Sequence, residues 1–427
     1  MHNIQPSIWA TIPFVLTLLA IAILPLANRK WWEKYYPAVT AILALVTILY
    51  YGAILRRMLP VLESLYEYIS FIALIGSLYV ISGGIHIRLK GRSRPVTNVL
   101  LLGAGALAAN LVGTTGASMI LIRPFLRVNN YRIKPYHVIF FIFIVCNIGG
   151  ALTPIGDPPL FVGYLEGIPF FWPIVNLWHI WIFALVILLA VFYVVDLREF
   201  REMNKAQQEY AIEEGEQGEV VGLHNLFFLL AVMIAVFVTH PIFLREAIML
   251  VAAAGSYFTT RSDVHKKNDF DFNPIKEVAI LFAGIFITMV PALEWIGTHA
   301  EVFGLNRPGE FYWTTGALSS VLDNTPTYLN FLSAAIGRFV HASLLSNSDV
   351  HPALYLLSTN KDVVQAISIG AVFFGAMTYI GNGPNFMVKS ISEQSGVDCP
   401  HFVSYVLRYS IPVLLPLFIL VWLVFFR

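Results

Sequence analysis

The chain has 427 residues, of which 57% are hydrophobic and only 12% are charged, with a mean hydropathy of +0.71. Because soluble domains carry roughly 25% charged residues, this composition excludes a soluble globular protein and indicates an integral membrane protein. The net charge of +1 gives no reason to expect a nucleic-acid partner, and Cys146 and Cys399 are too far apart for a metal or redox motif.

About ten apolar stretches have the length of a membrane-crossing helix, which needs about 20 residues. They are 8–26, 36–55, 63–86, 137–160, 171–195, 223–240, 244–260, 275–294, 363–387 and 403–426. The first stretch is too long for the hydrophobic part of a signal peptide, so we expect it to be retained as a span. The sequence therefore predicts an all-α, multi-pass protein of the inner (plasma) membrane, with the lipid bilayer as its surroundings.

Two further apolar stretches, 96–127 and 311–337, differ from the spans. At about 1.5 Å per residue, the first would form a helix of about 48 Å, which is too long for one crossing. Small polar residues lie at the middle of each stretch: Asn110, Thr114, Thr115 and Ser118 in the first, and Asp323, Asn324, Thr325 and Thr327 in the second. We interpret both as re-entrant hairpins with a polar tip; the alternative is a pair of kinked full spans.

The distribution of basic residues tests this interpretation. Arg88, Lys90, Arg92 and Arg94 precede the first hairpin, and Arg123, Arg127, Arg132 and Lys134 follow it. If the hairpin enters and leaves on one side, both groups lie on that side, and the opposite side carries few basic residues. The positive-inside rule then predicts that the first hairpin is cytoplasmic and that both termini are outside.

One phrase occurs twice in the chain. Residues 150–161 read Gly-Ala-Leu-Thr-Pro-Ile-Gly-Asp-Pro-Pro-Leu-Phe, and residues 375–386 read Gly-Ala-Met-Thr-Tyr-Ile-Gly-Asn-Gly-Pro-Asn-Phe. Each copy ends a long apolar stretch and breaks it with Gly, Pro and a carboxyl or amide side chain. A helix broken by polar residues at membrane depth, once in each half, is typical of the binding site of a secondary transporter.

The repeat also predicts the domain organisation. We expect a first repeat at 1–195, an acidic cytoplasmic linker at 196–222 and a second repeat at 223–427. Each repeat would contain three spans, a hairpin, a broken helix (137–161 or 363–387) and a final span. Because this makes five crossings, an odd number, the second repeat must be inverted in the membrane.

The tips and the breaks supply the candidate site. Backbone groups freed by a break must face protein or a cavity. Freed carbonyls with Thr and Asn oxygens suit a small cation, whereas half-helix N-termini offer partial positive charge to an anion. The predicted cation or substrate site comprises Asn110, Thr114, Thr115, Ser118, Thr153, Gly156, Asp157, Asp323, Asn324, Thr325, Thr378, Gly381, Asn382 and Asn385.

Asp157 and Asp323 are the two ionisable residues of this set, and an ionisable residue at membrane depth is a functional candidate by default. A carboxylate that binds either a proton or a cation supports the exchange of one for the other. We therefore predict sodium ligands at both positions, with no cofactor beyond the transported or coupling sodium ion and proton. The alternative is that each Asp only caps the N-terminus of a half-helix.

These segments resemble a known family. Residues 149–159, which end Thr-Pro-Ile-Gly-Asp-Pro-Pro, and residues 321–326, Val-Leu-Asp-Asn-Thr-Pro, are similar to motifs of the ion transporter superfamily. The superfamily includes NhaD-type sodium/proton antiporters, arsenite permeases, P-protein-like carriers, citrate transporters and divalent-anion/sodium symporters. The resemblance covers essentially the whole chain and is closest to the NhaD-type branch. The Ser-Asn-Thr tip that is typical of dicarboxylate symporters is absent.

The resemblance implies a homodimer in which a mobile transport domain moves against a scaffold by an elevator-like motion. It also implies that one cation site joins the first tip to 153–157, and that another joins the second tip to 378–385. We therefore expect a sodium/proton antiporter. A sodium-coupled carboxylate symporter for a citrate-like substrate is the alternative, and an anion permease such as an arsenite carrier is a third.

An enzyme is the alternative from a different class, because two intramembrane Asp residues could form an aspartyl protease. Such a dyad requires carboxyls within a few ångströms that share a proton. In the repeat, however, Asp157 corresponds to Asn382 and not to Asp323. We therefore do not expect an enzyme.

Overall fold

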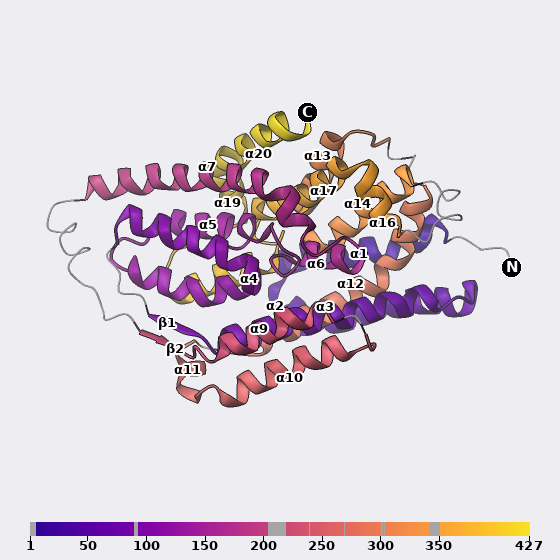
Figure 1. Cartoon of the computed structure of the whole chain (residues 1–427), viewed down its shortest axis with the longest axis horizontal. Helices are drawn as coiled ribbons and strands as arrows, with labels where there is room; N and C mark the ends of the chain where they lie inside the picture. Colours follow the sequence, from indigo (N-terminus) through magenta and orange to yellow (C-terminus); the bar gives the residue numbers. More distant parts are fainter. Residues whose placement is uncertain are drawn as a thin grey trace.

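The computed structural model describes residues 6–88, 93–203, 219–238, 240–268, 270–299, 302, 304–340 and 351–427. Helices dominate these residues, and the strands among them form one two-stranded sheet (Figure 1). Seven described helical stretches are long and apolar enough to cross a membrane: Ile8–Pro25, Lys30–Leu55, Leu59–Gly83, Pro95–Val128, Trp172–Glu202, Asn273–Ile296 and Phe402–Phe426. The chain is therefore an all-α, multi-pass membrane protein, as its composition predicts.

One part of the structure, which we name the α3 layer, is built around α3 (Leu59–Gly83) in the lower half of Figure 1. It consists of α1 (Ile12–Ala27), α2 (Arg29–Leu49) with its extension η2 (Tyr50–Leu55), α3, α9 (Asn225–Ala235), α10 (Leu244–Thr259) and α12 (Asn273–Thr298). α3 packs against α9, α10 and α12, and α12 packs against α1 and α2. Phe71, Met249 and Phe286 are buried in the core of this layer.

The second part, which we name the hairpin domain, has a core of its own that draws on both halves of the chain. Its main helices are α4 (Pro95–Val128), α5 (Pro135–Ile144), α6 (Pro158–Leu165), α7 (Trp172–Glu202), α13 (Pro308–Ser319), α14 (Asn324–Phe339), α17 (Lys361–Phe374), α18 (Gly383–Gln394) and α20 (Leu415–Val421). Buried residues of the domain, among them Ile155, Phe161 and Leu329, also join the core of the α3 layer. The two parts therefore share an apolar contact surface along α3.

Proline marks where many of these helices begin. A proline occupies one of the first two positions of α3, α4, α5, α6, α7, α12, α13, α18 and α20. The first N–H groups of a helix have no carbonyl acceptor within the helix, so proline loses no hydrogen bond there, and its fixed φ suits that position. The prolines therefore divide a nearly continuous apolar sequence into separate helices.

The first predicted hairpin is α4, which bends at Gly113. This residue has φ 77° and ψ 155°, a conformation that favours glycine. The two ends of α4 meet, because the side-chain amides of Asn98 and Asn129 each donate a hydrogen bond of 2.8 Å to the other. The chain thus reverses direction at the predicted tip and returns to its starting level.

A buried polar cluster fastens the ends of this hairpin to its neighbours. Asp196 of α7 is fully buried and accepts hydrogen bonds from Asn98 (3.0 Å), Tyr136 (2.6 Å) and the guanidinium of Arg132, one of whose nitrogens lies 2.9 Å away. Position 196 is the first residue of the predicted acidic linker, but α7 continues to Glu202. Residues 204–218, which form most of that linker, lie outside the described residues.

The second predicted hairpin consists of α13 and α14, joined by a turn at residues 320–323. Its outer ends also meet, because the guanidinium of Arg338 donates to Asn306 Oδ1 at 2.7 Å and the rings of Phe311 and Phe339 lie 6.1 Å apart. Both hairpins therefore have their polar tips inside the protein and their open ends tied by side chains.

The remaining described elements are short. They are η1 (Ile8–Thr11), β1 (His86–Arg88), η3 (Ile148–Gly150), β2 (Glu219–Val221), α11 (Ser262–Lys267), α16 (Pro352–Thr359), η5 (Gly375–Met377), α19 (Phe402–Tyr405), η6 (Val406–Leu414) and η7 (Trp422–Phe426). β1 and β2 pair antiparallel, with His86 opposite Val221. This pairing brings the end of the predicted linker beside the chain that follows α3.

Candidate functional site

Both predicted helix breaks are present. The first helix is interrupted between α5 and α6, with η3 and residues 151–157 in the gap, and the second is interrupted between α17 and α18, with η5 and residues 378–382 in the gap. The breaks lie beside the hairpin tips, because Thr153 donates to the carbonyl of Asn110 at 2.6 Å and Thr378 donates to the carbonyl of Ser320 at 2.7 Å. The same threonine position of each repeated phrase therefore ties a break to a tip.

The glycines of the repeated phrase are required by close backbone approach. A Cβ at Gly156 would lie 2.2 Å from the carbonyl oxygen of Gly150, and a Cβ at Gly381 would lie 2.6 Å from that of Gly375. Each of these glycines also donates its N–H to the threonine hydroxyl of its own break, at 3.0 Å and 3.1 Å. The phrase recurs because both breaks fold into the same tight turn.

Asp157 lies where the two halves meet. It is fully buried, and its Oδ1 accepts hydrogen bonds from the hydroxyl of Thr114 (2.9 Å) and the amide of Asn382 (3.0 Å), while its Oδ2 accepts from the amide of Asn324 (2.7 Å). These donors come from the first tip, the second break and the second tip. One carboxylate thus holds together all four segments that the sequence selected.

The capping role considered for Asp157 is wrong. Asp157 occupies the N-cap position of α6, but its side chain makes no capping hydrogen bond. The reason is local: Pro158 and Pro159 at the start of α6 have no N–H to offer, and the N–H of Leu160 donates to the backbone carbonyl of Asp157 at 3.0 Å. The carboxylate is therefore free for its three partners from other segments.

The capping role considered for Asp323 is confirmed. Asp323 is the N-cap residue of α14, and its Oδ1 accepts the backbone N–H of Thr325 at 3.0 Å. Asp323 also lines a cavity, together with Thr115 and Asn382 of the hairpin domain and Phe71 and Phe282 of the α3 layer. Its carboxylate is thus both a cap and part of a polar surface that faces α3.

Buried amides connect the two breaks around Asp157. Asn147 donates to Asn385 Oδ1 at 2.8 Å, and Asn385 donates to the carbonyls of Gly375 (2.8 Å) and Thr378 (2.9 Å). Asn147 thus bonds the helix that follows the second break. The oxygens Asn147 Oδ1 and Asn324 Oδ1 are buried without a hydrogen-bond partner in the described structure.

Asn110 and Ser118 lie at the edge of this arrangement. Asn110 donates to the carbonyl of Gly149 (2.7 Å) and accepts the N–H of Leu152 (2.9 Å), so both polar ends of its amide serve the first break. Ser118 contacts the sulfur of Cys146 at 3.1 Å, and the carbonyl of Cys146 accepts from Asn382 at 3.0 Å. The structure therefore brings the other predicted residues together and leaves Ser118 connected only through Cys146.

Two small cavities lie between the tips and α3. One has a volume of about 20 Å³ and is lined by Thr114, Thr115 and Gly156, and the other, beside Asp323, has a volume of about 40 Å³. Neither set of lining residues includes Lys, Arg or His. One water needs about 10–15 Å³ on this scale, so the cavities have room for one to a few waters or an ion.

Comparison with known proteins agrees with a carrier. The sequence model of a family described as "Putative citrate transport" matches residues 3–426. An uncharacterized transporter of Mycobacterium bovis is 25% identical over 317 residues, which cover 70% of this chain and 69% of that protein. A 46 kDa membrane protein of Mycobacterium leprae is 26% identical over 269 residues, which cover 58% of each chain.

Proposed function

We propose that this chain, which belongs to the family described as "Putative citrate transport", exchanges sodium ions for protons. The chain is a transporter, and what it carries is the part that we propose. The observation that carries the proposal is the cavity beside Asp323, whose largely apolar lining includes the polar side chains of Asp323, Asn382 and Thr115 and no basic residue. Hard oxygen ligands suit a small cation, and an anion would find no positive side chain there.

The polar lining of that cavity is arranged for a cation. Asp323 uses one carboxylate oxygen as the cap of α14. Asn382 uses its amide nitrogen for Cys146 and Asp157, which leaves its oxygen for the cavity. Thr115 adds a hydroxyl. We propose that Asp323, Asn382 and Thr115 bind the transported sodium ion.

Asp157 has a different proposed role, because its three donors already stabilise the ionised carboxylate. A proton on Asp157 would take the free lone pair of Oδ2, since Oδ1 already accepts two hydrogen bonds and Oδ2 accepts only one. The loss of charge would weaken the hydrogen bond from Asn324 to the same oxygen, because hydrogen bonds to ionised groups are the stronger ones. Protonation would thus loosen the second tip, and with it the neighbouring Asp323. Proton binding at Asp157 would then be coupled to cation binding at Asp323, although the two ions bind different carboxylates.

Asp157 and Asp323 lie at positions that are not equivalent in the two repeats. If the threonine contacts to Asn110 and Ser320 are equivalent, then Gly113 corresponds to Asp323 and Thr114 to Asn324. The repeated phrase pairs Asp157 with Asn382. Each half would therefore contribute one carboxylate, from the break in the first half and from the tip in the second. Two half-sites with different carboxylates fit one proton site and one cation site.

The membrane arrangement follows from the same proposal. We propose ten membrane crossings, two re-entrant hairpins and an inverted second half, in the inner membrane, with the first hairpin cytoplasmic. In this arrangement the hairpin domain is the moving part of an elevator-like cycle, and the α3 layer is the scaffold of a homodimer. The apolar contact between the two along α3 supports sliding, because it involves few directional bonds.

A sodium-coupled citrate symporter is the second candidate, which the family description favours. The helix N-termini at the site argue against it. α6 begins with two prolines and α18 has Pro384 as its second residue, so each terminus has fewer N–H groups to bind a carboxylate than an ordinary helix, although Gly383 keeps its own. A half-helix also offers only about half a positive charge, and burying an anion without a partner costs several kcal/mol.

The test uses purified protein in liposomes that contain a pH-sensitive dye and an acidic interior. Addition of sodium outside should release the quenching of the dye, and the Asp323→Asn variant should show no such response. Sodium-dependent accumulation of labelled citrate, with no sodium-induced change of internal pH, would instead establish the symporter.

A further inference from the structure

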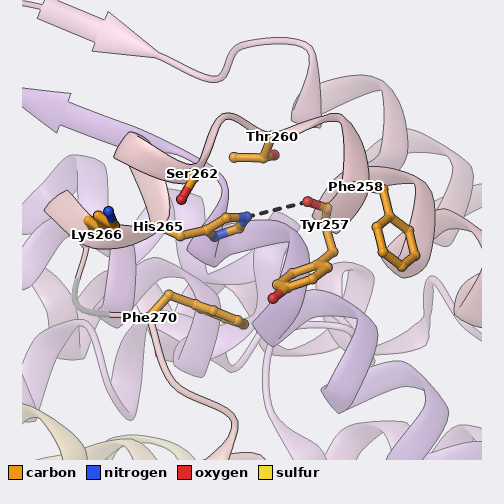
Figure 2. A pocket seen from close by; sticks show the side chains of 7 residues that line it. All are labelled: Tyr257, Phe258, Thr260, Ser262, His265, Lys266 and Phe270. Atoms are coloured by element: carbon orange, nitrogen blue, oxygen red, sulfur yellow. Dashed lines mark hydrogen bonds between the residues drawn. The ribbon is translucent and has the colours of Figure 1, made fainter.

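A third cavity lies away from the transport site, at the end of α10. It has a volume of about 550 Å³, which is within the range of about 300–1,000 Å³ for small-molecule sites. Figure 2 shows Lys266 and Phe258 at opposite ends of this pocket, with the rings of Tyr257, His265 and Phe270 between them. The pocket therefore has a charged end and an apolar end.

The apolar end continues along the outside of α10. Phe258 is 82% exposed and Val251 is 71% exposed, and they lie seven residues apart on one face of the helix. Leu244, a further seven residues back, is exposed as well. These side chains form an apolar stripe that ends at the mouth of the pocket.

The walls of the pocket are aromatic and rigid. The ring of His265 lies 5.0 Å from that of Tyr257 and 5.2 Å from that of Phe270. The ring of Phe270 is fixed in turn by α3, because a Cβ at Gly83 would lie 2.2 Å from it. The rings thus form a preformed surface between the helix and the loop that follows it.

The polar end offers hydrogen-bond donors that the protein leaves unused. Lys266 and Ser262 are exposed at the rim, and no carboxylate among the described residues pairs with Lys266. His265 Nε2 faces the carbonyl of Tyr257 at 3.4 Å, and His265 Nδ1 is buried without a partner in the described structure. Thr260 also lines the pocket, but its hydroxyl is occupied by Asn225 at 2.9 Å.

We propose that this pocket binds the headgroup of an anionic phospholipid. A phosphate diester would accept hydrogen bonds from Lys266 and Ser262, and the acyl chains would follow the stripe that ends at Phe258. Lys266 is the basic residue of the pocket, whereas the neighbouring Arg261 is paired with Asp263, and basic pockets on the cytoplasmic side of helices suit anionic headgroups. The apolar stripe favours a lipid over a free phosphate ester. The site does not depend on the transported ion.

Native mass spectrometry of the purified, delipidated full-length protein tests this proposal. With phosphatidylglycerol added, the protein should retain one lipid more tightly than it retains phosphatidylcholine. Lys266→Ala should weaken retention about fivefold or more, the factor expected for one basic residue at an anionic headgroup. Lys267→Ala is the matched control, because Lys267 is exposed and adjacent but does not line the pocket. Its effect should be less than about twofold on the same scale.

A second pair of variants tests the apolar end. Phe258→Ala should also weaken retention, whereas Phe227→Ala, which removes a ring that is 71% exposed on α9, should not. Equal effects of Lys266→Ala and Lys267→Ala, or equal retention of the two lipids, would overturn the proposal. Displacement of the lipid by an equal concentration of soluble glycerol phosphate would also overturn it, and would identify a free phosphate ester as the ligand.

Discussion

The carboxylates of Asp157, in the first break, and Asp323, at the second tip, should respond differently to the same substitution. Asp157→Asn leaves one acceptor oxygen where three donors converge, and the new amide nitrogen faces a donor. At least one hydrogen bond to a charged group is lost, which costs about 1.5–3 kcal/mol for each bond. Asp323→Asn removes the charge as well, but Asn is as good an N-cap as Asp, so the cap of α14 remains.

The assay pairs stability with transport. Thermal unfolding in detergent should show that Asp157→Asn lowers stability by about 2 kcal/mol or more, whereas Asp323→Asn changes it by less than about 0.5 kcal/mol. Both variants should lose sodium-dependent proton movement in liposomes. If Asp157→Asn were as stable as the native protein, its carboxylate would not hold the four segments together. If Asp323→Asn were the less stable of the two, Asp323 would be a structural residue.

The remaining predictions concern the turn, the repeat and the clasp of the first hairpin. Gly156→Ala should abolish the yield of folded protein, because its Cβ would lie 2.2 Å from a carbonyl oxygen. The control, Gly383→Ala, should fold normally, because nothing lies within 4 Å of its Cβ. Size-exclusion chromatography of both variants makes the comparison. Asn382→Asp should retain one additional proton at neutral pH, because two carboxylates about 3 Å apart cannot both ionise and the amide nitrogen of Asn382 lies 3.0 Å from Asp157 Oδ1. Proton release on alkaline unfolding measures the additional proton. Asp196→Asn should cost about 3–5 kcal/mol of stability in a detergent unfolding assay, since it leaves a buried guanidinium without its partner charge; a loss below about 1 kcal/mol would show that the cluster is not a clasp.

The turns of this fold can be predicted from sequence because they break an apolar pattern. Gly113 lies in a polar interruption of a stretch too long to be a single span, Asp323 lies in a polar interruption of the stretch 311–337, and both mark reversals of the chain. The breaks at Gly156 and Gly381 were predicted in the same way, from Gly and Pro in a membrane-length stretch. In each case the signal is local, since a few consecutive residues cannot continue a helix.

The partners of Asp157 could not be predicted, because they lie 43, 167 and 225 residues away along the chain. One part of its role was nevertheless present in the sequence. The two prolines after Asp157 remove two of the three N–H groups at the start of α6 and leave only that of Leu160 for a cap, which weakens the capping interpretation without a structure. The burial of Asp196 gave no such signal, because an acidic residue at a helix end followed by a charged segment usually faces solvent.

The central claim is that sodium and protons move in opposite directions through the site that contains Asp157 and Asp323. The most direct measurement records internal pH in liposomes that contain the protein, while sodium, lithium or potassium is added outside an acidic interior. The account predicts that sodium raises the internal pH and that Asp323→Asn abolishes the change. No response to any of the three cations, with sodium-driven uptake of labelled citrate in the same liposomes, would contradict it.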